Sequence, residues 1–221
     1  MAEKITLSDQ QGPEPSASKG AWILEEATKV FWKYGIRSVT MDDVSRHLGI
    51  SKKTLYQYVT DKSDLVTKVL SSTSDRFCVE IDRIRAAGHN AIEEMLAIAE
   101  YISKQISAFH PSIYFDLAKY YPEACRIMDK NKQVLVVEQI AENMRKGVRD
   151  GLYRADINVP LLAKLYVVRF DQAMTMEMGE QTGMSLAAMN WELFRYHIRG
   201  IASDKGLKYL EKKVTKERIE P

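Results

Sequence analysis

Apolar residues recur at helical spacing along most of this chain, and beyond Gly88 no stretch shows the alternation typical of a β-strand. The clearest short pattern lies in residues 40–62, where one apolar set ends at Gly49 and a second set follows. These apolar positions are Met41, Val44 and Leu48, and then Leu55 and Val59. Glycine tolerates the positive φ angle that often ends a helix, so Gly49 indicates a turn between two short helices.

Two hydroxyl residues stand where helix N-caps are expected. Thr40 precedes the first short helix, and Ser51 precedes the second, which we predict over residues 52–59. A hydroxyl oxygen at such a position accepts a hydrogen bond from a backbone N–H that has no partner within the helix. Two short helices joined by a tight turn that contains glycine form a helix-turn-helix.

The rest of the chain predicts further helices and therefore an all-α fold. Residues 19–34 have an apolar face centred on Phe31 and end at Gly35. Residues 1–18 contain little that could pack, so we predict a disordered tail there. Residues 19–66 would form a three-helix helix-turn-helix domain, and residues 67–221 a larger helical domain. The later helices are expected at residues 61–87, 91–108, 111–121, 122–150, 159–179, 185–203 and 205–216.

The second short helix directs an unusual set of side chains away from its apolar side. These are Lys53, Thr54, Tyr56 and Gln57, with Lys52 at the edge. In a DNA major groove, lysine bonds phosphate or guanine, glutamine bonds adenine, and threonine bonds phosphate or contacts a thymine methyl group. An ordinary solvated helix face is the alternative. The ring of Tyr56 favours DNA, because an exposed ring is costly without a partner.

Residues 21–65 resemble the DNA-binding domain of the TetR (tetracycline-repressor) family of bacterial transcription regulators. The resemblance covers about a fifth of the chain. Two positions depart from the commonest pattern of the family, because Val59 replaces a phenylalanine and Lys53 replaces a small residue. The matching residues are Ala27, Phe31, Gly35, Val39, Thr40, Met41, Val44, Gly49, Ile50, Ser51, Lys52, Thr54, Leu55, Tyr56, Tyr58, Lys62 and Leu65.

The resemblance also implies a partner, double-stranded DNA, and the residues that contact it. Two further candidate DNA contacts, Lys53 and Gln57, come from the polar side of the second short helix and not from the family. The contacts carried over from the family are Thr40, Ser51, Lys52, Thr54, Tyr56, Tyr58 and Lys62.

Composition and charge agree with a soluble protein that binds DNA through a local surface. The chain has 28% charged and 45% hydrophobic residues and a net charge of +2, so it has no strongly basic coat. Residues 19–68 contain nine Lys or Arg and six Asp or Glu, a net charge of +3. Cys78 and Cys125 lack metal-ligand spacing and indicate a reducing compartment. Without an apolar run of about 18 residues or a signal-peptide pattern, we expect a cytoplasmic protein that contacts no membrane.

Residues 159–179 and 185–203 are apolar on nearly all sides, as expected of helices that are buried on more than one face. One large core within the chain is one interpretation. The TetR resemblance favours a homodimer, whose two recognition helices would read a palindrome roughly 34–36 Å apart. A single short helix contacts few phosphates, and non-specific affinities of roughly 10⁻⁴ to 10⁻⁶ M are too weak for a regulator. The predicted dimerisation residues are Leu165, Leu186, Met189, Leu193, Phe194 and Ile198.

In the TetR family the larger domain encloses a pocket for a small molecule that weakens DNA binding. Aromatic and methionine residues are dense in this part of the chain, as they are in mostly apolar pockets. These residues could equally be ordinary core. Arg169 could bind an anionic ligand or pair with Asp116 or Glu177. The candidate lining residues are Tyr101, Phe109, Tyr114, Phe115, Arg169, Phe170 and Met174.

The sequence gives little support for catalysis, a metal site or a cofactor. It contains no zinc-protease motif, no nucleophile elbow and no glycine-rich phosphate loop. The histidines are scattered along the chain at His47, His89, His110 and His197. We therefore predict that the chain is not an enzyme.

Together these patterns predict a ligand-responsive, homodimeric transcriptional repressor that leaves a palindromic operator when a small-molecule effector binds. One alternative is an activator or co-repressor-type regulator whose ligand strengthens DNA binding. Another is a helical binding protein without DNA recognition. The sequence identifies neither the effector nor the operator, because base readout also depends on DNA shape.

Overall fold

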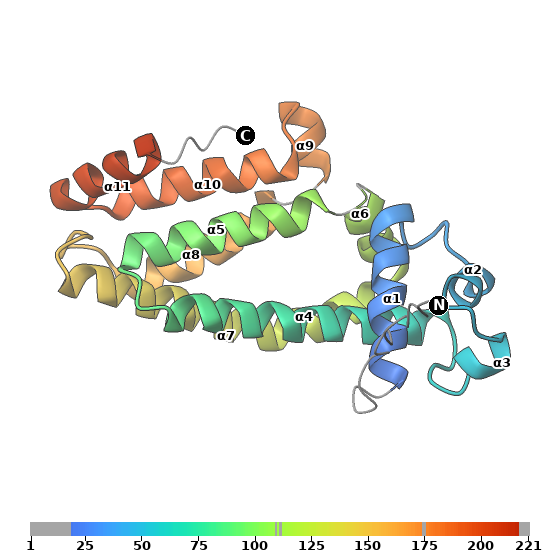
Figure 1. The fold of residues 1–221 in the computed structure, drawn as a ribbon. Coiled ribbons are helices and arrows are strands. Elements are labelled where there is room, and N and C mark those ends of the chain that lie inside the picture. The colour runs from blue at the N-terminus through green and yellow to red at the C-terminus, as the bar shows by residue number, and fades with distance from the viewer. Residues whose placement is uncertain (1–18, 109, 111, 174–175, 217–221) are drawn as a thin grey trace, which may run out of the picture.

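The computed structural model describes residues 19–108, 110, 112–173 and 176–216, and these residues form eleven α-helices. The predicted all-α fold is confirmed, and the tail predicted over residues 1–18 lies outside the described residues. None of the described helices is both long and apolar enough to cross a membrane. In chain order the helices are α1 (Lys19–Tyr34), α2 (Met41–His47), α3 (Lys52–Leu55), α4 (Lys62–Ala86), α5 (Ala91–Ser107), α6 (Ser112–Tyr120), α7 (Pro122–Arg149), α8 (Val159–Ala173), α9 (Met176–Thr182), α10 (Leu186–Ile201) and α11 (Asp204–Lys216) (Figure 1).

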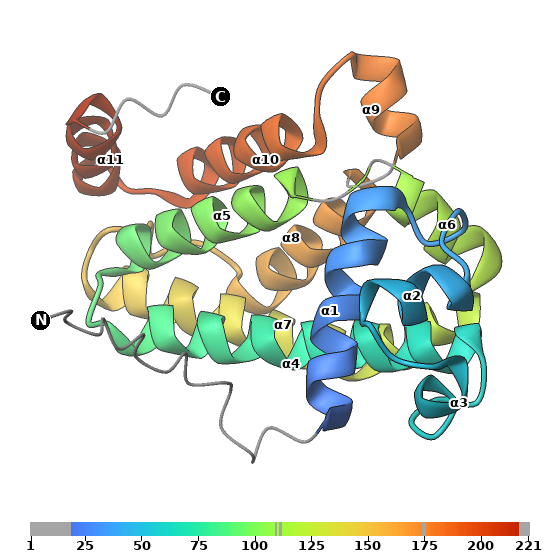
Figure 2. The ribbon, with the colours of Figure 1, turned by 45° about the vertical axis from the view of Figure 1, so that its right-hand side comes forward.

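The helices form an elongated body with α1, α2 and α3 at one end (Figure 1). α4 begins against α1 at that end and continues along the body, where it contacts α5 and α7. α10 packs on α5, and α8 packs on α7. α11 lies at the end of the body far from α3 (Figure 2). α4 is therefore an element that both ends of the molecule share.

The first core is small and lies where α1, α2, α3 and the beginning of α4 meet. Phe31 is fully buried in it, with 0% of the residue exposed, as predicted for the centre of this core. α6 also contributes Ile113, so the core extends beyond the domain boundary predicted at residue 66. Other large members of this core are Ile23, Ile36, Val44, Leu55, Leu65, Val66 and Val69.

Both predicted N-caps of the helix-turn-helix are present. Thr40 and Asp43 form a capping box at the start of α2, in which each side chain accepts a hydrogen bond from the other residue's backbone N–H. The Oγ of Ser51 accepts a hydrogen bond from the N–H of Thr54, 3.0 Å away, and so caps α3. Gly49 has a φ angle of 63°, as expected of a residue that ends α2. The local sequence signals for these two helices are confirmed.

Two helices differ from the prediction. α3 ends at Leu55 rather than near Val59, because the N–H groups of Gln57 and Tyr58 bond carbonyls three residues back and tighten the chain into turns. The helix predicted over residues 159–179 is divided into α8 and α9. Because the sequence has no glycine or proline at this division, apolar spacing alone predicted one continuous helix.

A second core lies among α5, α7, α8, α10 and α11, and it contains a buried polar network. The Nδ2 of Asn143 donates to the carbonyl of Ala91 and to the Oε1 of Glu94, each at 3.0 Å. The Nζ of Lys146 donates to the other carboxylate oxygen of Glu94 at 2.8 Å. The buried carboxylate of Glu94 therefore has a counter-charge, which its burial requires.

Phe31→Ala should lower the free energy of unfolding by about 3–5 kcal/mol, because the lost ring leaves a cavity in the first core. Tyr34→Ala, on the same helix, removes a side chain that is 53% exposed. That control should change the free energy by about 0.5 kcal/mol or less. Urea denaturation followed by circular dichroism measures both variants. Equal losses in the two would show that Phe31 is not central to this core.

Candidate nucleic-acid interface and ligand cavity

α3 presents its polar side chains to solvent. Leu55 and Val59 are buried in the first core, so the opposite side of this short segment faces outward. Tyr58 packs against the core, whereas Tyr56 is 47% exposed and is the accessible one of the two predicted tyrosine contacts. Thr54 is partly covered. The exposed residues of this surface are Ser51, Lys52, Lys53, Tyr56 and Gln57.

The two lysines of α3 differ in how available their charges are. The Nζ of Lys52 lies 2.5 Å from the Oδ1 of Asp42 on α2, so this charge already has a partner. Lys53 is exposed and forms no ion pair with any residue in the described part of the chain. Lys53 therefore offers the freer positive charge to a polyanion.

Thr40 and Ser51 use their hydroxyl groups within the helix-turn-helix while both residues remain exposed. The Oγ1 of Thr40 donates to the Oδ2 of Asp43 at 2.6 Å, and this bond holds the pKa of the Asp43 carboxyl below its usual value. The Oγ of Ser51 lies 2.9 Å from the Oγ1 of Thr54. Each of these bonds fixes the first turn of its own helix.

Lys62 begins α4, but its ammonium group is directed back toward the protein. Its Nζ donates to the backbone carbonyl of Arg37 at 3.1 Å. Burial lowers the pKa of the Lys62 ammonium group, against the opposing effect of the carboxylates of Asp116 and Asp43. Lys62 therefore ties α4 to the turn between α1 and α2, a role that the resemblance did not indicate.

α6 holds the same turn through a buried carboxylate. The Oδ2 of Asp116 accepts a hydrogen bond at 2.9 Å from the N–H of Arg37, a residue 79 positions away in the sequence. Gly35 has a φ angle of 81°, and a Cβ atom there would lie 2.6 Å from the Oγ of Ser112. The turn of residues 35–37 is thus fitted closely against α6.

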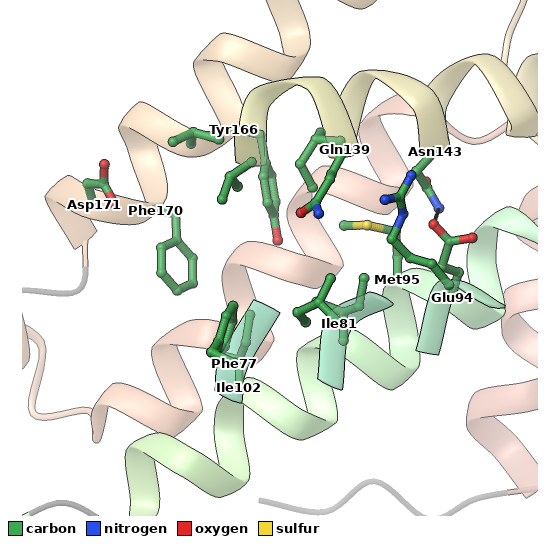
Figure 3. A pocket seen from close by; sticks show the side chains of 15 residues that line it. Phe77, Ile81, Glu94, Met95, Ile102, Gln139, Asn143, Tyr166, Phe170 and Asp171 are labelled. Carbon is green, nitrogen blue, oxygen red and sulfur yellow. Dashed lines mark hydrogen bonds between the residues drawn. The ribbon is translucent and has the colours of Figure 1, made fainter. Parts of the chain in front are cut away.

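A cavity of about 290 Å³ lies between α4, α5, α7 and α8 (Figure 3). This volume is close to the lower end of the range for ligand pockets. Arg85, Glu94, Gln139, Asn143 and Asp171 supply the polar part of its lining. The apolar part includes Phe77, Ile81, Met95, Ile102, Tyr166 and Phe170. Because α4 contributes to this wall, the cavity borders the helix that also enters the first core.

Most of the predicted pocket residues do not line this cavity. Phe170 does. Tyr101 lies beside Phe77 with ring centroids 5.5 Å apart but is not part of the lining, and Tyr114 and Phe115 belong to α6, which does not border the cavity. Aromatic density along the sequence cannot distinguish a cavity wall from a surface, and Phe115 is in fact exposed. Two predicted residues lie outside the described residues, Phe109 and Met174.

Arg169 lies on the outer side of α8, over the ring of Tyr196 and 4.7 Å from its centroid. Arg169 is exposed to solvent, so the expectation that its charge is buried among the apolar residues of this helix is corrected. Arg169 forms no ion pair with Asp116 among the described residues, and the Asp116 carboxylate instead accepts a hydrogen bond from the backbone N–H of Arg37.

Three of the six predicted dimerisation residues, Met189, Phe194 and Ile198, are buried inside the chain. The structure therefore places them in the chain's own core, where a second copy cannot contact them. Helical spacing groups such residues on one face but does not show what covers that face. Leu186 and Leu193 are partly buried, and Leu165 is 42% exposed. The exposed apolar residues of α8 and α10 share only Leu165 with the predicted set, and they are Leu161, Leu165, Val168 and Tyr196.

Residues 23–69 match the family model described as bacterial regulatory proteins, tetR family. Residues 23–69 therefore belong to the TetR family. HTH-type transcriptional regulators of Staphylococcus aureus strains USA300 and NCTC 8325 are each 32% identical to this chain over 80 residues. These matches cover 36% of the chain and 43% of each relative, which is less than half the length of those proteins.

Solved structures resemble the chain over most of its length. KstR2, a ketosteroid transcriptional regulator of Mycobacterium tuberculosis, gives a TM-score of 0.52 at 22% identity over 85% of this chain and 97% of that one. A transcriptional regulator from Cytophaga hutchinsonii gives 0.67 at 19% identity over 82% and 97%. FadR, a fatty acid degradation regulator from Bacillus halodurans, gives 0.61 at 17% identity over 86% and 97%. At these identities the likeness shows the fold alone.

Asp116→Ala should lower the free energy of unfolding by about 1–3 kcal/mol, because the N–H of Arg37 loses its acceptor. Asp116→Asn keeps an oxygen acceptor and should cost less. Lys119→Ala, at an exposed position of the same helix, is the control. Hydrogen exchange at the amide of Arg37 reports the bond directly and should be faster in Asp116→Ala. Unchanged exchange there would contradict this joint between α6 and the turn.

Proposed function

We propose that this chain is a ligand-responsive transcriptional repressor that binds a palindromic operator as a homodimer and leaves it when a small-molecule effector binds. The observation that carries the proposal is the exposed polar side of α3, which the burial of Leu55 and Val59 directs outward. Membership of the TetR family supports DNA as the partner of this surface.

Lys53, Tyr56 and Gln57 are the side chains best placed to contact DNA, because all three are exposed on one short segment. Lysine and glutamine bond phosphates and base edges in a major groove, and tyrosine bonds phosphate. The remaining proposed contacts include both exposed and partly covered residues. They are Thr40, Ser51, Lys52, Thr54, Tyr58 and Lys62.

A second copy of the chain would supply the second recognition helix. α8 exposes Leu161, Leu165 and Val168 at positions i, i+4 and i+7, which form one apolar stripe. α10 adds Tyr196, whose ring lies against Arg169 of α8. Exposed apolar patches mark interaction sites. An isologous contact through this stripe would give the two-fold symmetry that a palindrome requires.

α4 supports a coupling between the cavity and the DNA-binding end. Its first turns place Leu65 and Val69 in the first core, and its later turns place Phe77 and Ile81 in the cavity wall. A ligand that favours another position of α4 would move α3 relative to its copy in the dimer. By thermodynamic reciprocity, DNA would then weaken ligand binding by the same factor.

Tyr56→Ala and Lys53→Ala should each weaken binding to DNA that flanks the chain's own gene. The loss should be roughly fivefold or more where a base contact is removed. If Lys53 contacts a phosphate, its loss should also reduce the slope of log affinity against log salt concentration by about 0.9. Fluorescence anisotropy at several salt concentrations measures both quantities, and circular dichroism should show unchanged helicity.

Lys33→Ala is the matched control for Lys53→Ala, because it removes an equal charge from an exposed position on α1. It should leave the affinity and the salt slope nearly unchanged. If Tyr56→Ala and Lys53→Ala bound DNA as the unaltered chain does, α3 would not be the contact surface. A chain that bound no duplex at all would be a helical binding protein instead. A cavity ligand that strengthened DNA binding would make it a co-repressor-type regulator or activator.

Leu165→Glu should raise the dissociation constant of the dimer by roughly tenfold or more, because it places a carboxylate in an apolar contact. Leu135→Glu makes the same change at an exposed leucine of α7 and serves as the control. Sedimentation equilibrium measures the association state of both variants. A dimer that tolerated Leu165→Glu as well as Leu135→Glu would show that the copies meet through another face.

A further inference from the structure

Two polar side chains face the interior of the cavity between α4, α5, α7 and α8. Figure 3 shows the hydroxyl of Tyr166 and the amide of Gln139 directed into its middle, across from Phe77 and Ile81. Neither group forms a hydrogen bond with any residue that the structure describes. Such groups in apolar surroundings favour a ligand that can satisfy them.

The hydroxyl of Tyr166 is kept as a hydrogen-bond donor. Burial raises the pKa of Tyr166 to about 12, so the phenol retains its proton near neutral pH. Its ring contacts the imidazole of His197, with ring centroids 4.2 Å apart. Burial lowers the pKa of His197 to about 4, so this imidazole is neutral and adds no positive charge beside the cavity.

None of the charged residues that line the cavity places an unpaired charge in the middle of the cavity. Arg85 forms an ion pair with Glu142, and Glu94 accepts a hydrogen bond from Lys146 at 2.8 Å. Asp171 is exposed and lies at the opposite end of the cavity from Glu94 (Figure 3). An ionised group of a ligand in the apolar middle would lack a counter-charge, which is costly. The enclosed part of a ligand is therefore neutral.

The volume of the cavity limits the size of the ligand. About 290 Å³ equals about ten water volumes at roughly 30 Å³ for each molecule. A molecule of about ten non-hydrogen atoms fits this space. Most of these atoms should be carbon, because Phe77, Ile81, Met95 and Phe170 form much of the wall.

We propose that this cavity binds a neutral, mostly apolar molecule of about ten non-hydrogen atoms with one carbonyl or hydroxyl oxygen near its middle. That oxygen accepts one hydrogen bond from the hydroxyl of Tyr166 and a second from the amide of Gln139. A ligand hydroxyl also donates to the amide oxygen of Gln139. The role of such a molecule as an effector rests on the proposed function, whereas its binding does not.

Three probes of similar size test the proposal on the full-length protein by isothermal titration calorimetry. Dibutyl ketone carries a central oxygen, butylbenzene carries none, and nonanoate carries a terminal charge. The ketone should bind roughly fivefold to a hundredfold more tightly than butylbenzene, because it forms two hydrogen bonds that butylbenzene cannot form. Nonanoate should bind more weakly than the ketone, because its charge would have no counter-charge inside the cavity.

Tyr166→Phe and Gln139→Leu each remove one of the two hydrogen bonds with little change in side-chain volume. Each should weaken ketone binding by roughly twofold to tenfold. Both should bind butylbenzene at least as tightly as the unaltered chain does, which verifies that the variant proteins keep the cavity intact. Tyr101→Phe removes the hydroxyl of a tyrosine that lies beside Phe77 but outside the lining, and it should alter neither affinity.

Nonanoate binding more tightly than the ketone would overturn the proposed ligand class. So would a ketone affinity that is the same in Tyr166→Phe, Gln139→Leu and the unaltered chain. Failure of the proposed function is distinguishable from both results. If only the proposed function were wrong, the ketone would still bind more tightly than butylbenzene and nonanoate, which supports the ligand class. The ketone would then leave the affinity of the protein for its DNA unchanged.

Discussion

The burial of Leu55 and Val59 is the constraint on which the rest of the molecule depends. These two side chains hold α3 and the turns that follow it against the first core, and their burial leaves Lys53 and Tyr56 exposed on the other side. The cap at Ser51 adds a fixed beginning to this short helix. The polar surface is thus a consequence of packing. This surface does not require the whole chain to be strongly basic, because the net charge of the chain is only +2.

α4 connects the cavity to the core that holds that surface. Leu65 holds its beginning in the first core, and Ile81 lies in the cavity wall farther along the same helix. Between them is Thr73, whose hydroxyl oxygen is buried and has no hydrogen-bond partner among the described residues. A buried group without a partner costs free energy, so the middle of α4 is less well satisfied than its ends.

The sequence is informative where a structure forms within a few residues and uninformative where distant segments meet. Thr40, Gly49 and Ser51 signalled their helix ends because caps and turns are local. The bond from Arg37 to Asp116 spans 79 positions and has no local signal. Apolar spacing placed Phe194 on the correct helix, but its coverage by the chain itself depends on tertiary packing. The cavity is a space between four helices, which no local pattern describes.

Hydroxyl-radical footprinting on the DNA that flanks the chain's own gene tests the central claim most directly, because it locates protein on both half-sites at once. If α3 enters a major groove twice in each dimer, the protected positions should form two symmetric patches with centres about 10–10.5 base pairs apart or a multiple of that distance. A single patch, or no protection at protein concentrations at which the dimer is formed, would contradict the claim.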